Sequence, residues 1–340
     1  KFDRIELFLF ADGQLVDHQL NGESVPYSQR PTPGLLMAFA LRLESGKPYQ
    51  LLISTNSRLP QALAFELESP VNFAASAGQS GINWGTFYSV FLLTIILALI
   101  FLIITRDPLY LYLGLLIGAL TLTQGSYTTY AYWLLWPESP EWQRSAHLFF
   151  IGVTILCGPL FTRRFLDTAT NTPRLDRWIK ANSMVGLIAI ACALTLPYQP
   201  AAIINNLSIV VAVIPVVAAS IICLKNGVKT ARFFLFGWGA NIVLTLAHIA
   251  HLRGFLPYSD FIQLAPQLGC MLEVLSLVAA IADRYEAVRE GCEQSFRQVV
   301  KADALGELAL GRVGRKRHQA DVQLIHAPGD EGDVGLGGVA

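Results

Sequence analysis

The residue in this sequence with the most obvious capacity for chemistry is a carboxylate inside an apolar stretch. Glu273 lies near the middle of residues 261–282, which are otherwise almost entirely apolar. A charged side chain at the centre of a bilayer costs roughly 2.5–3.5 kcal/mol on insertion scales. Glu273 must therefore face other helices, carry a proton or pair with a partner, and both a signalling role and a purely structural hydrogen bond are open to it.

Two histidines and an asparagine lie in the preceding apolar stretch, residues 233–252. His248 and His251 are three residues apart, so a helix places them on one face. That spacing suits either a metal or proton-transfer site or, as we favour, hydrogen bonding near the membrane surface. We expect Asn241 to hydrogen-bond between helices. These three residues and Glu273 are our ligand or signalling candidates, and we predict no catalytic residue, metal site or cofactor.

Seven apolar stretches must position these side chains. A helix that spans a bilayer needs about 20 apolar residues, and all but the short fourth stretch come close. The composition agrees, because 53% of the residues are hydrophobic and 15% are charged, against about 25% charged in soluble domains. We predict an all-α membrane bundle of seven helices over residues 83–104, 109–127, 145–165, 181–196, 201–224, 233–252 and 261–282.

In the first 80 residues the spacing of apolar side chains differs from that of the helical stretches and predicts a β-structure. Residues 4–10, 14–20, 35–43, 49–55 and 63–67 are expected strands, separated by turn signals such as Asp12-Gly13. Five short strands at this spacing suggest part of an antiparallel β-sandwich or jelly roll. Such a domain could be a sensor or a folded spacer. The chain opens on Lys1 without a methionine, so we expect the true N-terminus to lie upstream.

The cations in the connections between the stretches are unevenly distributed. If the N-terminal segment is outside, only Arg144 and Arg253 lie in outer connections. The eleven on the inner side are Arg106, Arg163, Arg164, Arg174, Arg177, Lys180, Lys225, Lys229, Arg232, Arg284 and Arg289. The positive-inside rule then predicts a periplasmic N-terminus and a cytoplasmic C-terminus. An aromatic belt is expected at the outer surface, made of Tyr127, Tyr130, Tyr132, Trp133, Trp136 and Trp142.

After the last stretch, apolar residues recur at spacings of three and four. They are Tyr285, Val288, Cys292, Phe296 and Val299. This pattern favours a coiled coil through which two copies dimerise, with an ordinary amphipathic helix as the alternative. We expect this signalling helix over residues 284–310, and a disordered or aberrant tail over residues 311–340.

Several short motifs, taken in order, resemble one family. They are residues 106–113 (RDPLYLYL), 164–168 (RFLDT), 172–175 (TPRL), 226–238 (NGVKTARFFLFGW), 254–257 (GFLP) and 269–277 (GCMLEVLSL). The ordered set is similar to the bacterial seven-transmembrane receptors with diverse intracellular signalling modules (7TMR-DISM). The resemblance implies a multi-pass receptor of the bacterial inner membrane, with a periplasmic jelly-roll domain at 1–80, a membrane domain at 81–283 and a cytoplasmic output module.

Residues 301–310 (KADALGELAL) resemble the start of a histidine kinase phosphoacceptor helix. That family continues with a Gly-x-x-His-Glu motif, whereas here His318 is followed by Gln319. We therefore expect a kinase output that is truncated or frameshifted, with no complete catalytic domain in this chain. The expected partners are the lipid bilayer, a second copy of the chain and an unknown small-molecule or carbohydrate-like ligand, but no nucleic acid.

Function remains open between two classes at this point. A signal-transducing receptor fits the arrangement of an outer domain, seven spans and an emerging helix. A small-molecule transporter or channel is the alternative, and it should show inverted repeats and broken helices with facing polar groups. The spans show only Glu273 and isolated polar residues, which favours the receptor.

The distribution of cations gives a direct test of orientation. We expect a reporter enzyme that works only in the cytoplasm to be active when fused after Arg289, because the inner connections carry most of the Lys and Arg residues. The same reporter fused within the first 80 residues should be inactive. A fusion after Arg289 that is active only in the periplasm would contradict the predicted orientation.

Overall fold

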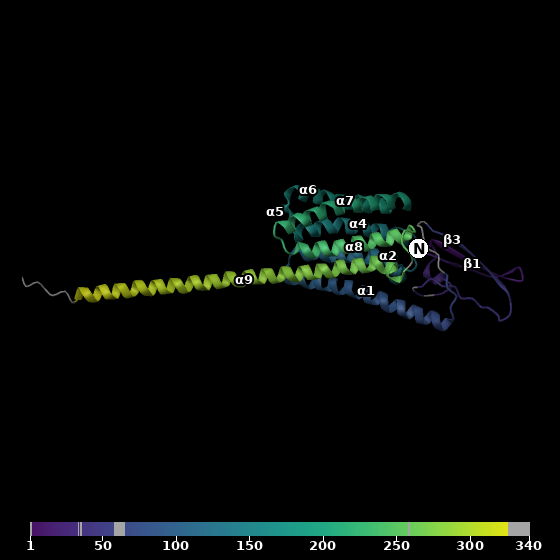
Figure 1. Ribbon diagram of the computed structural model, residues 1–340, viewed down its shortest axis with the longest axis horizontal. Coiled ribbons are helices and arrows are strands. Elements are labelled where there is room, and N and C mark those ends of the chain that lie inside the picture. Colours follow the sequence, from purple (N-terminus) through teal and green to yellow (C-terminus); the bar gives the residue numbers. More distant parts are fainter. Residues whose placement is uncertain (1, 33, 35, 58–64, 258, 326–340) are drawn as a thin grey trace, which may run out of the picture. The chain divides into compact units, whose positions relative to one another are not determined.

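The computed structural model describes residues 2–32, 34, 36–57, 65–257 and 259–325. Strands β1 (Arg4–Ala11), β2 (Gln14–Asn21) and β3 (Tyr49–Asn56) and the 3-10 turn η1 (Tyr27–Gln29) come first. The helices are α1 (Pro70–Thr105), α2 (Pro108–Tyr127), α3 (Tyr130–Leu135), α4 (Pro140–Phe165), α5 (Thr168–Asn171), α6 (Pro173–Thr195), α7 (Tyr198–Lys225), α8 (Ala231–Leu252) and α9 (Asp260–Ile325). Figure 1 shows α1, α2, α4, α6, α7 and α8 running side by side.

The three strands form an antiparallel sheet in the order β2-β1-β3. Asp12 and Gly13 connect β1 to β2 with positive φ angles of 52° and 76°, the backbone that a tight hairpin turn requires. The central strand β1 buries Ile5, Leu7 and Leu9, alternate residues that share one face. The predicted strands at 4–10, 14–20 and 49–55 are therefore confirmed.

The predicted strand at residues 35–43 is wrong over its described part. Residues 36–43 form no ladder with a neighbouring strand. Instead, side chains of β2 reach this segment, since Gln19 Nε2 donates to Ala40 O at 2.7 Å and Asn21 Nδ2 donates to Ala38 O at 3.3 Å. Of the predicted strand at 63–67, residues 63 and 64 lie outside the described residues, and 65–67 form no strand.

Within the described residues, seven helices are long and apolar enough to cross a membrane: α1, α2, α4, α6, α7, α8 and the portion Phe261–Arg297 of α9. Each prediction of a span is thus matched by a helix. The first begins earlier than expected, at Pro70, where Ser69 Oγ accepts a hydrogen bond from Asn72 N at 3.3 Å. The fourth, predicted to be short, is lengthened by a start at Pro173.

Helices α4 and α6 approach each other closely because each presents a glycine to the other's backbone. A Cβ atom added at Gly186 of α6 would lie 2.5 Å from Leu156 N in α4. One added at Gly152 of α4 would lie 2.9 Å from Ile190 N in α6. Neither position has room for a side chain, so the two glycines set the distance between these helices.

Pro215 lies inside α7 and removes one backbone donor from that helix. The carbonyl four residues earlier, Val211 O, thereby loses its partner within α7. Asn182 of α6 supplies the missing donor, because its Nδ2 lies 3.2 Å from Val211 O. The proline is therefore accommodated by a hydrogen bond from the neighbouring helix.

The last helix continues further than the sequence predicted. The chain divides into two compact units, Lys1–Ile281 and Ala282–Ala340, and α9 extends to Ile325. Residues 311–325 form part of α9, so the disorder predicted from residue 311 is not seen there, whereas an aberrant origin of the tail stays a prediction. Residues 326–340 lie outside the described residues.

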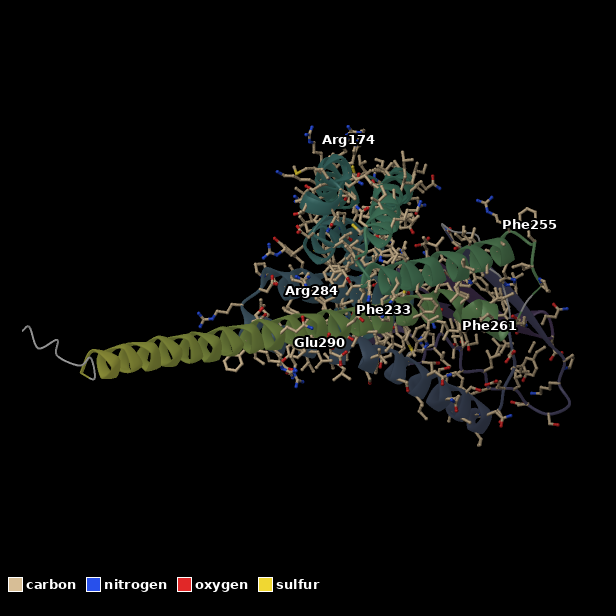
Figure 2. All side chains as sticks on the ribbon, turned by 60° about the vertical axis from the view of Figure 1, so that its left-hand side comes forward. Arg174, Phe233, Phe255, Phe261, Arg284 and Glu290 are labelled. Atoms are coloured by element: carbon tan, nitrogen blue, oxygen red, sulfur yellow. The ribbon has the colours of Figure 1, made fainter. Side chains whose placement is uncertain are left out.

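Each of the two units exposes large apolar side chains. Phe255 and Phe261 lie near the connection between α8 and α9 and are largely exposed (Figure 2). In the second unit, Tyr285 and Phe296 are exposed as well. A coiled coil would cover these last two side chains, but that remains a prediction.

Substitution of glycine by alanine should affect stability differently at the contact between α4 and α6 and at a glycine that has no close neighbour. Gly186→Ala should lower the stability of the purified protein by about 1–3 kcal/mol, because the methyl group meets backbone. Gly118→Ala in α2 should leave stability unchanged or raise it by up to about 1 kcal/mol, since nothing lies within 4 Å and alanine favours helix. Thermal unfolding in detergent measures both, and equal effects would contradict the close packing.

Candidate functional site

Glu273 is buried, and its carboxylate has a partner on the neighbouring helix. Asn241 Nδ2 of α8 donates to Glu273 Oε2 of α9 at 2.6 Å. Only 4% of Glu273 is exposed. The two candidates are thus brought together, and the carboxylate faces the bundle rather than lipid, as the energetic argument from the sequence requires.

Other polar groups extend this pair into a cluster that links three helices. Thr245 Oγ1 donates to Asn241 Oδ1 at 3.3 Å, and Cys270 Sγ donates to the same oxygen at 3.9 Å. Gln124 of α2 donates through Nε2 to Cys270 Sγ at 2.9 Å. We call Gln124, Asn241, Thr245, Cys270 and Glu273 the polar cluster. It contributes hydrogen bonds between α2, α8 and α9.

Two glycines hold α8 and α9 close together around the polar cluster. A Cβ atom at Gly269 would lie 2.8 Å from Asn241 Oδ1 and 2.9 Å from Asn241 Cα. A Cβ atom at Gly237 would lie 2.9 Å from Ser276 Cβ and 3.0 Å from Glu273 Cα. Gly237 of α8 and Gly269 of α9 each contact the backbone of the other helix. A small shift of α9 along α8 therefore changes the distance and angle of the hydrogen bond between Asn241 and Glu273.

The two histidine candidates do not join this cluster. His248 Nδ1 lies 3.0 Å from Ile262 O, the carbonyl left without a helical partner by Pro266. A carbonyl can only accept, so Nδ1 carries the proton and donates. His251 Nδ1 lies 3.1 Å from Leu256 O, in the connection that follows α8. Each histidine therefore stabilises backbone, and the described residues contain no group of three metal-ligating side chains.

A second set of contacts joins the β-sheet segment to the helices. We call it the junction: residues 22–30 on one side and residues 126–143 on the other. Tyr27 N donates to Pro137 O at 3.0 Å. Ser28 donates through its backbone N and its Oγ to the two carboxylate oxygens of Glu138, at 3.2 and 2.7 Å. The turn η1 is thereby fixed to the connection between α3 and α4.

An aromatic pair lies at the centre of the junction. Tyr132 OH donates to Val25 O at 3.0 Å, and the rings of Tyr132 and Tyr27 pack edge to face with centroids 4.9 Å apart. The Arg30 guanidinium lies 3.8 Å from the centroid of the Tyr27 ring and donates to Gly22 O at 2.8 Å. Burial raises the pKa of Tyr132 to about 12, so its phenol remains a donor at neutral pH.

Gln143 connects the junction to the membrane helices. Its Nε2 donates to Glu23 Oε1 at 3.1 Å and to Ser126 O, at the end of α2, at 2.9 Å. Its Oε1 accepts from Trp136 Nε1 at 2.9 Å. The Gln143 amide is buried, and both its nitrogen and its oxygen are hydrogen-bonded. It therefore connects the sheet segment to α2 and α4.

The junction corrects part of the predicted aromatic belt. Tyr132 has no exposed surface, and the indole N–H of Trp136 donates a hydrogen bond to Gln143. These two residues therefore contact protein. Trp133, by contrast, is 39% exposed. Composition alone could not separate the two roles, because an aromatic-rich connection is typical both of a membrane surface and of a packed interface. The sequence reasoning therefore missed the junction.

Comparison with protein families now agrees with this architecture. A multi-pass membrane protein with an extramembrane β-segment is the class that the fold defines. The family model for the 7TM diverse intracellular signalling domain matches residues 81–284, which is more than half of the chain, and that for 7TMR-DISM extracellular domain 2 matches residues 1–69. The chain belongs to the 7TMR-DISM family of membrane receptors. No curated protein and no solved structure matches it.

The junction predicts a local effect of removing one hydroxyl. Tyr132→Phe keeps the ring but loses the donor to Val25 O, so opening of residues 22–30 should become easier by about 1 kcal/mol. Amide hydrogen exchange of that segment should then be about fivefold faster. Tyr130→Phe, in the same short helix, is the matched control and should leave the exchange unchanged. Identical exchange in wild type and Tyr132→Phe would show that this bond is unimportant.

Proposed function

We propose that this receptor lies in the bacterial inner membrane and passes a periplasmic or membrane stimulus to a cytoplasmic output module. The N-terminal segment would be periplasmic and the C-terminal helix cytoplasmic, as the cation distribution predicts. The observation that carries the proposal is the junction, because it joins the segment that would receive the stimulus to the helices that cross the membrane.

The junction supports transmission because the hydrogen bonds of Tyr132 and Gln143 within it are buried and polar. Movement of the sheet segment cannot leave Gln143 in place without breaking its bond to Glu23. A buried donor or acceptor left without a partner costs about 1–3 kcal/mol. This energy is of the size that typically couples two sites in an allosteric protein, so binding to the sheet segment could shift α2 and α4.

The polar cluster supports a switch on the last helix. Asn241 and Glu273 form a short hydrogen bond exactly where glycines bring α8 and α9 into contact. Since α9 is the helix that continues toward the C-terminus, a displacement of α9 has two consequences. It changes the Asn241–Glu273 bond, and it moves the exposed helix beyond Ile281. We propose that the two signalling states differ in this bond.

The output and the ligand are further parts of the proposal. The likeness of residues 301–310 to a phosphoacceptor helix supports a histidine kinase as the output, with two copies of the chain joined through the C-terminal helix. The ligand is proposed to be a small or carbohydrate-like molecule that binds the sheet segment.

Glu273→Gln gives the sharpest test of the switch. The change keeps the shape and the bond from Asn241 but removes the possibility of a charge, so the balance between states should shift. We expect at least a fivefold change in unstimulated output from a full-length receptor, which corresponds to about 1 kcal/mol, with normal membrane insertion. A transcriptional reporter of the output measures it.

The control is Glu290→Gln, the same substitution at an exposed position further along α9 (Figure 2). It should leave output unchanged. If Glu273→Gln and Glu273→Ala both signal like wild type at equal expression, Glu273 is a structural residue and the proposed switch is wrong.

A further inference from the structure

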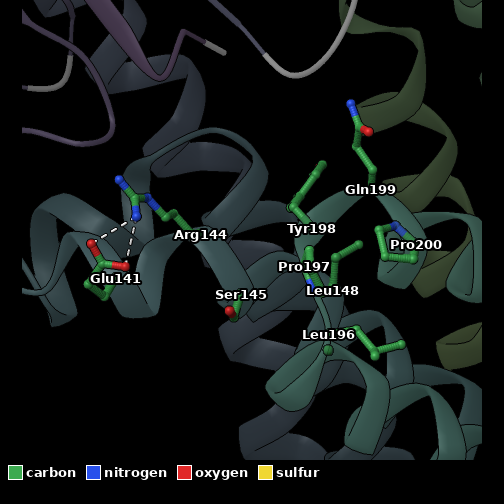
Figure 3. Close-up of a pocket in the computed structure, with 10 residues that line it drawn as sticks. Glu141, Arg144, Ser145, Leu148, Leu196, Pro197, Tyr198, Gln199 and Pro200 are labelled. Carbon is green, nitrogen blue, oxygen red and sulfur yellow. Dashed lines mark hydrogen bonds and ion pairs between the residues drawn. The ribbon is translucent and has the colours of Figure 1, made fainter.

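A pocket of about 550 Å³ lies beside α4 at the edge of the junction (Figure 3). Helix α4 contributes Glu141, Arg144, Ser145 and Leu148 to its lining. The end of α6, the connection and the start of α7 contribute Ala193 and residues 196–200. The volume falls within the range of roughly 300–1,000 Å³ that is usual for small-ligand sites.

The pocket and the junction use different faces of one helix. Positions 141, 144, 145 and 148 follow the spacing that places residues on one side of a helix. Gln143 is offset from all of them and contacts Glu23 of the sheet segment. A ligand in the pocket would therefore touch the helix that holds the junction without displacing the junction itself.

The polar side of the pocket carries one positive and one negative group next to each other. Arg144 Nη1 lies 2.9 and 2.8 Å from the two carboxylate oxygens of Glu141. Arg144 Nε is buried and has no hydrogen-bond partner within the described part of the chain. Glu141 is largely exposed, and ion pairs this exposed contribute little to stability. The pair can open at low cost to bind an anion at Arg144 and a cation at Glu141.

The opposite side of the pocket is apolar and continuous with the membrane-spanning helices. Leu148 and Ala193 pack with Ala201 into a small buried cluster, against which Tyr198 also packs. Leu196 adds a partly exposed apolar side chain at the rim. Figure 3 shows the Glu141–Arg144 pair on one side and Leu196, Pro197 and Tyr198 on the other.

We propose that this pocket binds a membrane phospholipid with a zwitterionic ethanolamine headgroup. The phosphate would lie against the Arg144 guanidinium, the primary ammonium against the Glu141 carboxylate, and an acyl chain along Leu148 and Leu196. The pocket lies at the ends of spanning helices, where headgroups meet protein. The apolar wall favours a lipid over a soluble zwitterion. This inference does not depend on the proposed signalling function.

Lipid retention by the purified full chain tests the proposal. The protein is reconstituted in nanodiscs of equal parts phosphatidylethanolamine, phosphatidylglycerol and phosphatidylcholine, extracted into detergent, and weighed by native mass spectrometry. We expect one phosphatidylethanolamine to be retained per chain in preference to phosphatidylglycerol or phosphatidylcholine. Arg144→Gln and Glu141→Gln should each reduce that retention about tenfold. Arg253→Gln, which alters a cation outside the pocket, should not change it.

Two further measurements keep the outcome decisive. Ser145→Trp fills the pocket without changing its charges and should also abolish retention, with thermal unfolding showing that each variant is folded. Soluble phosphoethanolamine should bind far more weakly than the lipid. Equal retention of all lipids, or retention unaffected by the three pocket variants, would overturn the proposal. Tight binding of soluble phosphoethanolamine would overturn the choice of a lipid.

Discussion

The structure of the membrane domain depends on one constraint: a polar group within the bilayer must find its partner inside the protein. Prolines make the constraint visible, because each leaves a carbonyl without its helical donor. Asn182 of α6 fills the gap that Pro215 opens in α7, and His248 of α8 fills the gap that Pro266 opens in α9. Each repair is made by the adjacent helix, so satisfying the backbone also fixes which helices are neighbours.

The same constraint explains why the candidate residues separate into two kinds. Glu273 and Asn241 satisfy each other through side chains, and their bond can be exchanged for another without unravelling a helix. The histidines bind backbone carbonyls, and losing the His248 bond would leave Ile262 O without a partner inside the bundle. A side-chain pair such as Asn241–Glu273 can therefore change between two states of the protein. The contacts of the histidines with backbone are expected to stay the same in both states.

The sequence predicted the spans well because most are long and predominantly apolar, a signal that needs no knowledge of tertiary contacts. It also predicted that Glu273 needs a partner. Which residue is that partner depends on the rotation and stagger of α8 against α9. The close contacts at Gly237 and Gly269 fix that arrangement, and they are visible only in the folded structure. The strand expected at 35–43 failed for a similar reason. The segment is almost continuously apolar, yet side chains of β2 rather than a strand donate to two of its carbonyls, Ala38 O and Ala40 O.

The close contact of α4 with α6 has a mechanical consequence. Glycines on both helices bring backbone against backbone, which leaves no compressible side chain between them. At its far end α4 is held again, since Arg163 forms two hydrogen bonds, of 2.8 and 2.9 Å, with Asp176 of α6. Helices α4 and α6 are therefore held together at two levels, so a displacement of Gln143 at the start of α4 must move α6 as well or break one of these contacts.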